Sequence, residues 1–110
     1  MASGGAAEQL AAAYLVRQGL VLVECNFRCR LGEIDLIMRD RQTLVFIEVR
    51  QRASLRFGGA IASIDQRKQQ KLIVTAQLYL ARLPRTPPCR FDALLVQGER
   101  IEWIRDAFSA

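Results

Sequence analysis

The stretch of residues 32–52, GEIDLIMRDRQTLVFIEVRQR, constrains the fold of this chain most strongly. It predicts two strands joined by a short polar turn at residues 39–42. Both strands are nearly continuous apolar runs, which is typical of a sheet that is covered on both faces. Asp35 and Glu48 interrupt these runs, and burying an unpaired carboxylate is costly. Each acid therefore needs a partner, either a basic side chain or a metal ion.

The alternation of side chains along a strand assigns residues to the two faces of this hairpin. The first strand has Glu33, Asp35 and Ile37 on one face. The second strand has Leu44, Phe46, Glu48 and Arg50 on one face and Val45, Ile47 and Val49 on the other. Arg50 follows Glu48 by roughly 7 Å along the strand. An acid on one strand, with Glu-x-basic on its neighbour, can hold a hard divalent cation beside a phosphate.

The size and composition of the chain indicate one ordinary soluble domain, residues 1–110. A chain of 110 residues is long enough for a single core and too short to divide. Its hydrophobic fraction of 51% and charged fraction of 25% are those of a globular protein. No apolar run approaches the roughly 20 residues of a membrane helix, and the opening MASGGAAEQ lacks the features of a signal peptide. We therefore expect a cytoplasmic protein with no membrane partner.

The balance of charge favours an anionic partner, with nucleic acid first. The formal net charge is +5, and only two of the 16 basic residues, Lys68 and Lys71, are lysines. The planar fork of arginine suits phosphate oxygens, although a genome rich in arginine codons would give the same composition. The chain has no histidine, which excludes Ser-His and Cys-His nucleophilic catalysis. Its three cysteines lack the spacing of a zinc site.

The remaining elements follow in order around the hairpin. An alanine-rich helix after Gly5 ends at Gly19, and Glu8 in its first turn either favours the helix dipole or leans over the sheet as an outer metal ligand. A strand covers residues 20–30. Ser63 is the expected N-cap of a helix over residues 64–83. Strands at 89–96 and 100–104 complete the order αβββαββ, in which the second helix is the crossover of a parallel strand pair.

Basic residues outside the hairpin present two further candidate surfaces. Arg52 and Arg56 lie in a polar loop after the second strand of the hairpin, where they either clamp a backbone phosphate or stay solvated. Lys68 and Lys71 lie one turn apart on the second helix, on a strip that is either an ordinary solvated face or a phosphate contact. Asp92, near the start of an apolar strand, is most simply explained by an ion pair with Arg90 or another arginine.

These segments resemble the YraN family of small bacterial proteins over nearly the whole chain. The resemblance is carried by the helix with Glu8, by GEIDLI, VFIEVRQR, FGGA, the Lys68/Lys71 helix, RFD and the closing AF. That family is similar in turn to the PD-(D/E)xK nuclease superfamily, in particular to archaeal Holliday junction resolvases. The resemblance implies an α/β fold of the restriction endonuclease type, with a mixed sheet and a helix on each side.

The resemblance also implies roles for individual residues. Asp35 matches the superfamily's motif aspartate, Glu48 matches the acid of (D/E)xK, and Glu8 matches the acid that many of these nucleases carry on the first helix. Arg50 stands where the nucleases have lysine; it stays protonated, so it can stabilise phosphate charge but cannot act as a base. Asp35, Glu48, the backbone carbonyl of Val49 and, through water, Glu8 would hold Mg²⁺ or Mn²⁺.

The implied function is metal-dependent hydrolysis of DNA phosphodiester bonds, in branched or repair intermediates. Arg52, Arg56, Lys68 and Lys71 would position the DNA backbone. Junction resolvases work as dimers, so the resemblance leaves a homodimer open. One alternative is a non-catalytic nucleic-acid-binding module of the same fold, for which Arg50 is the best argument. Another is a protein-interaction subunit in which Asp35, Glu48 and Arg50 form a buried salt-bridge cluster.

Overall fold

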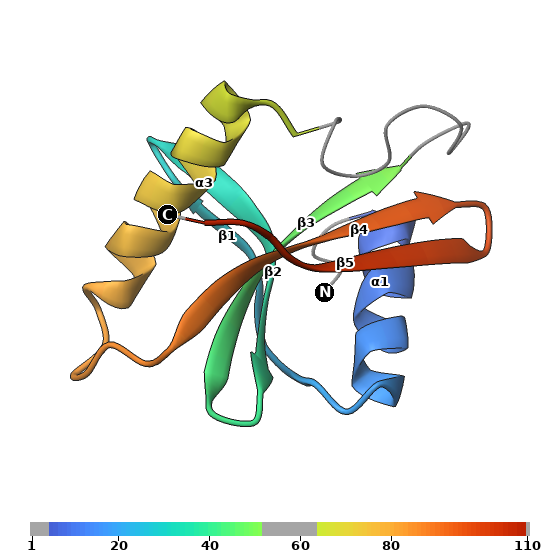
Figure 1. Ribbon diagram of the computed structural model, residues 1–110, viewed down its shortest axis with the longest axis horizontal. Coiled ribbons are helices and arrows are strands. Elements are labelled where there is room, and N and C mark those ends of the chain that lie inside the picture. Colours follow the sequence, from blue (N-terminus) through green and yellow to red (C-terminus); the bar gives the residue numbers. More distant parts are fainter. Residues whose placement is uncertain (1–4, 52–63, 110) are drawn as a thin grey trace.

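The structure, a computed structural model, describes residues 5–51 and 64–109. Its elements in chain order are α1 (Ala6–Arg17), β1 (Val21–Cys29), β2 (Gly32–Asp40), β3 (Thr43–Gln51), α3 (Gln66–Leu80), β4 (Cys89–Gln97) and β5 (Arg100–Phe108). This is an α/β fold with the order αβββαββ (Figure 1), as the sequence predicts. Within these described residues, no helix combines the length and apolarity needed to cross a membrane.

The five strands form one mixed sheet in the order β1-β2-β3-β4-β5. The pairs β1–β2, β2–β3 and β4–β5 are antiparallel, whereas β3 and β4 are parallel. A parallel pair needs a long crossover connection, and α3 lies in the connection between β3 and β4. The prediction of a helical crossover is therefore confirmed. Because β3 and β4 are parallel, their C-terminal ends lie side by side.

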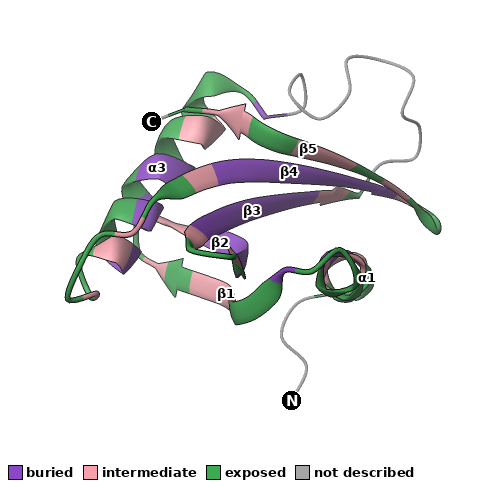
Figure 2. Cartoon of the chain, turned by 60° about the horizontal axis from the view of Figure 1, so that its bottom comes forward, coloured by how far each residue is buried: buried purple, intermediate pink, exposed green. Residues whose placement is uncertain are grey.

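A helix covers each face of the sheet. Ala11 and Leu15 of α1 pack with Val45 and Ile47 in one core cluster. The other cluster joins residues of α3 to the opposite face, including Phe46. Burial is concentrated in the central strands, while β1 and β5 at the two edges are more exposed (Figure 2). The expected separation of Leu44 and Phe46 from Val45, Ile47 and Val49 is confirmed.

The second helix begins later than the sequence analysis predicts. Asp65, rather than Ser63, is the N-cap of α3, and its carboxylate accepts a hydrogen bond from the backbone N–H of Lys68 at 2.9 Å. An acidic N-cap stabilises the first turn through both this bond and the helix dipole. Ser63 lies outside the described residues. The helix ends at Leu80, after which the N–H of Leu83 bonds to the Leu80 carbonyl at 3.0 Å in a tighter turn.

The approach of α3 to the start of β2 depends on Gly32. A Cβ atom built at Gly32 would lie 2.8 Å from Oγ1 of Thr75 on α3. That hydroxyl is itself fixed, because it donates a hydrogen bond to the carbonyl of Lys71 at 2.7 Å. Glycine at this position therefore lets the helix pack closely over the strand that carries Asp35.

Candidate functional site

The two acids of the hairpin lie where β2 separates from β3. The ladder of paired residues between these strands ends at Leu36 and Ile47, and one step further the same register would place Asp35 opposite Glu48. The backbone N–H of Val49 does not bond to a main-chain carbonyl of β2 but donates to Oδ2 of Asp35 at 2.8 Å. A side chain thus replaces a ladder hydrogen bond, and both acids are buried, with exposed fractions of 8% and 5%.

The backbone of β2 changes its facing at Asp35. Regular alternation would put Ile34 with Leu36, on the face opposite Ile37. In the structure, Ile34 and Ile37 belong to the same core cluster, and Leu36 belongs to the other. The regular alternation expected along this strand is therefore broken between Ile34 and Leu36. Sequence alternation assumes a flat strand and gives no sign of this irregularity.

Asp35 has an electrostatic environment that disfavours its ionised form. Burial, the negative charge of Glu48 and a contribution from Glu8 raise its pKa from 3.8 to about 8, against the opposing effect of the Val49 N–H. Desolvation and like charge both raise the pKa of a carboxyl group. No ion pair with a basic side chain is recorded for Asp35 within the described residues. A bound cation would relieve both costs.

Glu48 is flanked by two basic side chains. Its Oε2 atom lies 3.2 Å from Nε of Arg50 and 3.6 Å from Nζ of Lys68. Its other oxygen, Oε1, is buried and has no hydrogen-bond partner in the described part of the chain. Buried polar atoms are nearly always paired, so this oxygen is free to bind a ligand. The prediction that Glu48 needs a partner is confirmed by Arg50 and Lys68.

Glu8 lies in the first turn of α1 and also acts on the buried Asp35. Its Oε1 accepts a hydrogen bond from the N–H of Gly5 at 2.9 Å at the start of α1. It also acts on Asp35, through its charge and through a side-chain hydrogen bond. A cavity of about 200 Å³ lies between this first turn of α1 and Val49 and Gln51 of β3. Glu8 is therefore placed beside the pair of buried acids.

The predicted site residues divide into three groups. Asp35, Glu48, Val49, Arg50 and Glu8 come together as expected, and Lys68 joins them, although the sequence analysis assigned it only to DNA. Lys71 is exposed on α3. Arg52 and Arg56 lie outside the described residues. No sequence signal could link Lys68 to Glu48, because their contact depends on how the crossover helix packs.

The donor set fits a hard divalent cation. Mg²⁺ is usually held by one or two carboxylates, with water completing its coordination. Asp35 and the unpartnered oxygen of Glu48 supply such ligands, and the carbonyl of Val49 belongs to the same strand end. In the described segments, no three acidic or cysteine side chains are grouped closely enough to hold a metal ion. A cation at this place would therefore depend on the two buried carboxylates and on water.

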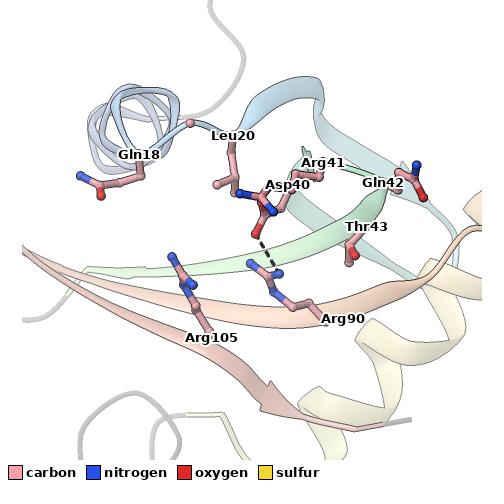
Figure 3. A pocket seen from close by; sticks show the side chains of 9 residues that line it. Gln18, Leu20, Asp40, Arg41, Gln42, Thr43, Arg90 and Arg105 are labelled. Carbon is pink, nitrogen blue, oxygen red and sulfur yellow. Dashed lines mark hydrogen bonds and ion pairs between the residues drawn. The ribbon is translucent and has the colours of Figure 1, made fainter.

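A larger cavity, of about 870 Å³, lies at the opposite end of β3, where this strand begins. Its lining includes Gln18, Asp40, Thr43, Arg90 and Arg105. Figure 3 shows Arg90 directed at Asp40 on its wall. Nη1 of Arg90 donates to Oδ2 of Asp40 at 3.0 Å, while Nε and Nη2 bond to Asp92. Each of the three guanidinium nitrogens thus already donates to an acid, and neither Asp35 nor Glu48 lines this cavity. Size alone does not identify the candidate site.

Fold and site together define a small α/β protein with a buried carboxylate pair at the end of a central strand. A model of the uncharacterised protein family UPF0102 matches residues 7–96. The chain belongs to this family, which is the YraN-like family indicated by its motifs.

Similar proteins occur in several bacteria. A UPF0102 protein of Nitrosomonas europaea is 60% identical over 108 residues, which cover 96% of this chain and 92% of the relative. One from Methylobacillus flagellatus is 54% identical over 110 residues, covering 97% and 96%. One from Janthinobacterium sp. is 50% identical over 108 residues, covering 98% and 88%. The likeness therefore extends over nearly the full length of these proteins.

Proposed function

We propose that this protein is a cytoplasmic, metal-dependent nuclease that hydrolyses phosphodiester bonds in DNA, with branched or repair intermediates as its substrates. The observation that carries the proposal is the buried pair Asp35 and Glu48. Within the described part of the chain, Asp35 has a raised pKa and no basic partner, and Glu48 keeps a buried oxygen without a hydrogen bond. A core that needed only stability would satisfy such groups.

The carboxylates of Asp35 and Glu48 would hold Mg²⁺ or Mn²⁺, with Val49 offering its carbonyl and Glu8 orienting a water. When bound, the cation polarises the phosphate and lowers the pKa of the attacking water. The N–H of Val49 holds one oxygen of Asp35 and so directs the other towards the ligand. Every ligand of this set lies on α1, β2 or β3.

The two basic residues beside Glu48 would have different tasks. Arg50 remains protonated at any working pH, so it stabilises the negative charge of the phosphate. Lys68 carries the amine that the nuclease motif places two residues after its acid, and it reaches Glu48 from α3 instead. An amine can exchange a proton when its environment changes. Lys68 is therefore the candidate for orienting or deprotonating the attacking water.

A non-catalytic nucleic-acid-binding module is the second candidate function. It is favoured by the contacts of Arg50 and Lys68 with Glu48, because two internal cations already neutralise this acid without a metal ion. Such a module would keep the fold and bind DNA without cutting it. Metal dependence separates the two candidates.

Incubation with a panel of branched, nicked and linear DNAs, in Mg²⁺, Mn²⁺ or EDTA, tests the proposal. We expect cleavage of at least one branched substrate with metal, none in EDTA and none by Asp35→Asn or Glu48→Gln. Binding without cleavage in any metal would favour the second candidate. Light scattering on the same samples measures whether the protein acts as a homodimer, as junction resolvases do.

A further inference from the structure

Asn26 departs from strand geometry in the middle of β1. Its φ angle is +55°, a region that Asn tolerates better than most residues. Residues two apart on a regular strand share a face, yet Cys25 packs with the core cluster under α1 and Phe27 packs with the cluster under α3. Asn26 is the position at which β1 changes its facing, as β2 does at Asp35.

The register of the sheet places Asn26 directly beside the acid pair. Cys25 pairs with Leu36 and Phe27 pairs with Ile34, so Asn26 lies opposite Asp35. Continuation of the β2–β3 register places Asp35 opposite Glu48. Asn26, Asp35 and Glu48 thus form one polar row across three adjacent strands. Because neighbouring strands are about 4.8 Å apart, the backbone positions of Asn26 and Glu48 are about 10 Å apart.

The two ends of this row carry complementary atoms without partners. Among the described residues, Nδ2 of Asn26 is a buried donor with no acceptor, and Oε1 of Glu48 is a buried acceptor with no donor. Backbone geometry explains why residue 26 tolerates a positive φ, but it does not explain a buried amide nitrogen without an acceptor. A phosphate group bound through a cation would satisfy both, because its oxygen accepts from the amide and the cation binds the carboxylate.

We propose that Asn26 is a substrate-binding residue whose side-chain amide donates a hydrogen bond to an oxygen of the phosphate held at Asp35 and Glu48. This inference rests on the proposed function and adds to it a contact from the edge strand. The amide is neutral, so it contributes geometry and one hydrogen bond without adding charge. Its contribution can therefore be separated from that of the basic residues.

The test uses Asn26→Gly and Asn26→Ala as a matched pair. Both remove the amide, but glycine accepts a positive φ freely and alanine does not. The affinity of each variant for a fluorescein-labelled branched DNA is measured by anisotropy over a salt series, with Mn²⁺ and with EDTA. Melting temperatures are recorded alongside.

We expect both variants to bind the DNA roughly tenfold or more weakly than the wild type with Mn²⁺, the scale of one hydrogen bond to a charged group. The dependence of affinity on salt should not change, because no charge is removed. Asn26→Gly should keep the wild-type melting temperature, whereas Asn26→Ala should lower it.

Two other results would overturn the inference in distinguishable ways. If Asn26→Gly binds as tightly as the wild type, residue 26 acts through its backbone alone, while the proposed function stands. If the wild type itself binds none of the DNAs, the proposed function fails and this contact fails with it. Asn26→Asp gives an independent reading, since a fourth carboxylate facing the phosphate should weaken binding in EDTA more than the loss of the amide does.

Discussion

Two buried aspartates of the same sheet, Asp92 and Asp35, have opposite surroundings. Asp92 is fully buried and accepts four hydrogen bonds, from Nε and Nη2 of Arg90 at 3.0 and 3.2 Å, from Nε1 of Trp103 at 3.0 Å and from the N–H of Asp106 at 2.9 Å. Asp35 accepts one bond from a backbone N–H and lies among acids. The fold satisfies one carboxylate with four donors, whereas it gives the other a single backbone donor and acidic neighbours.

The difference shows how a buried charge can be assigned to structure or to function. The charge of Asp92 on β4 is paired with Arg90, and its carboxylate also accepts hydrogen bonds from Trp103 and Asp106 of β5. Asp92 therefore holds β5 against β4. It confirms the predicted ion pair with Arg90. Asp35 lowers the stability of the fold in its ionised form, and natural proteins keep such groups mainly at functional sites. Four experiments can break or sharpen this comparison, in order of decreasing effect.

The same substitution at both aspartates should have opposite effects on stability. Asp92→Asn removes the charge that neutralises Arg90, and breaking a buried pair costs about 3–5 kcal/mol. Asp35→Asn removes like-charge repulsion, so its free energy of unfolding should equal or exceed that of the wild type. Urea denaturation at neutral pH measures both. Equal losses in the two variants would remove the distinction.

Stability should fall as pH rises between about 4 and 8, because of Asp35. Its pKa is raised from 3.8 to about 8 in the folded state, so the folded protein holds this proton more tightly than the unfolded chain. Folding is therefore favoured below the lower value, and the advantage is lost as pH rises through the higher one. The change should be on the order of a few kcal/mol. Chemical denaturation across this range, repeated on Asp35→Asn, should show a flatter profile in the variant.

Arg90 and Arg50, the arginines of the two sites, should also differ in what their removal costs. Arg90 makes three hydrogen bonds to Asp40 and Asp92, whereas the side chain of Arg50 is 35% exposed and, among the described residues, forms an ion pair only with Glu48. We expect Arg50→Ala to fold normally, with a loss of at most about 1 kcal/mol, and to lose on the order of a hundredfold in cleavage rate. Arg50→Lys should keep or raise the rate.

Melting temperature and cleavage rate are therefore measured on both Arg50 variants. A large fall in the melting temperature of Arg50→Ala, with no cleavage by the wild type or by Arg50→Lys in any metal, would make Arg50 a structural ion-pair partner. Arg50 would then be a structural residue like Arg90, and Glu48 would be a structural acid like Asp92.

The lysines of α3 should give the smallest effect, measured in the salt dependence of DNA binding. Each phosphate neutralised on B-DNA contributes about −0.9 to the log–log slope. Replacing Lys68 and Lys71 together by alanine should flatten the slope by roughly one to two units. Lys71→Ala alone should account for about one of these, because Glu48 already offsets the charge of Lys68. An unchanged slope in the double variant would remove α3 from the DNA-binding surface.

Patterns among residues close together in the sequence predicted most of the secondary structure and the position of the acid pair. Apolar periodicity indicated the order of the elements and the two covered faces, and the acids within the hairpin indicated where partners were needed. Features that depend on tertiary packing were missed. Lys68 reaches Glu48 through the packing of α3 on the sheet, and the changes of facing at Asn26 and Asp35 leave no pattern in the sequence. Asp65 displaced Ser63 as a cap because its carboxylate reaches the N–H of Lys68.

Titration calorimetry with Mn²⁺ tests most directly whether Asp35 and Glu48 form a cation site. The wild type is compared with Asp35→Asn, Glu48→Gln and the control Asp40→Asn, which removes an acid of the larger cavity. We predict one saturable site in the wild type and in the control, abolished by Asp35→Asn and strongly weakened by Glu48→Gln. Binding that is absent from the folded wild type, or that persists unchanged in Asp35→Asn, would contradict the account.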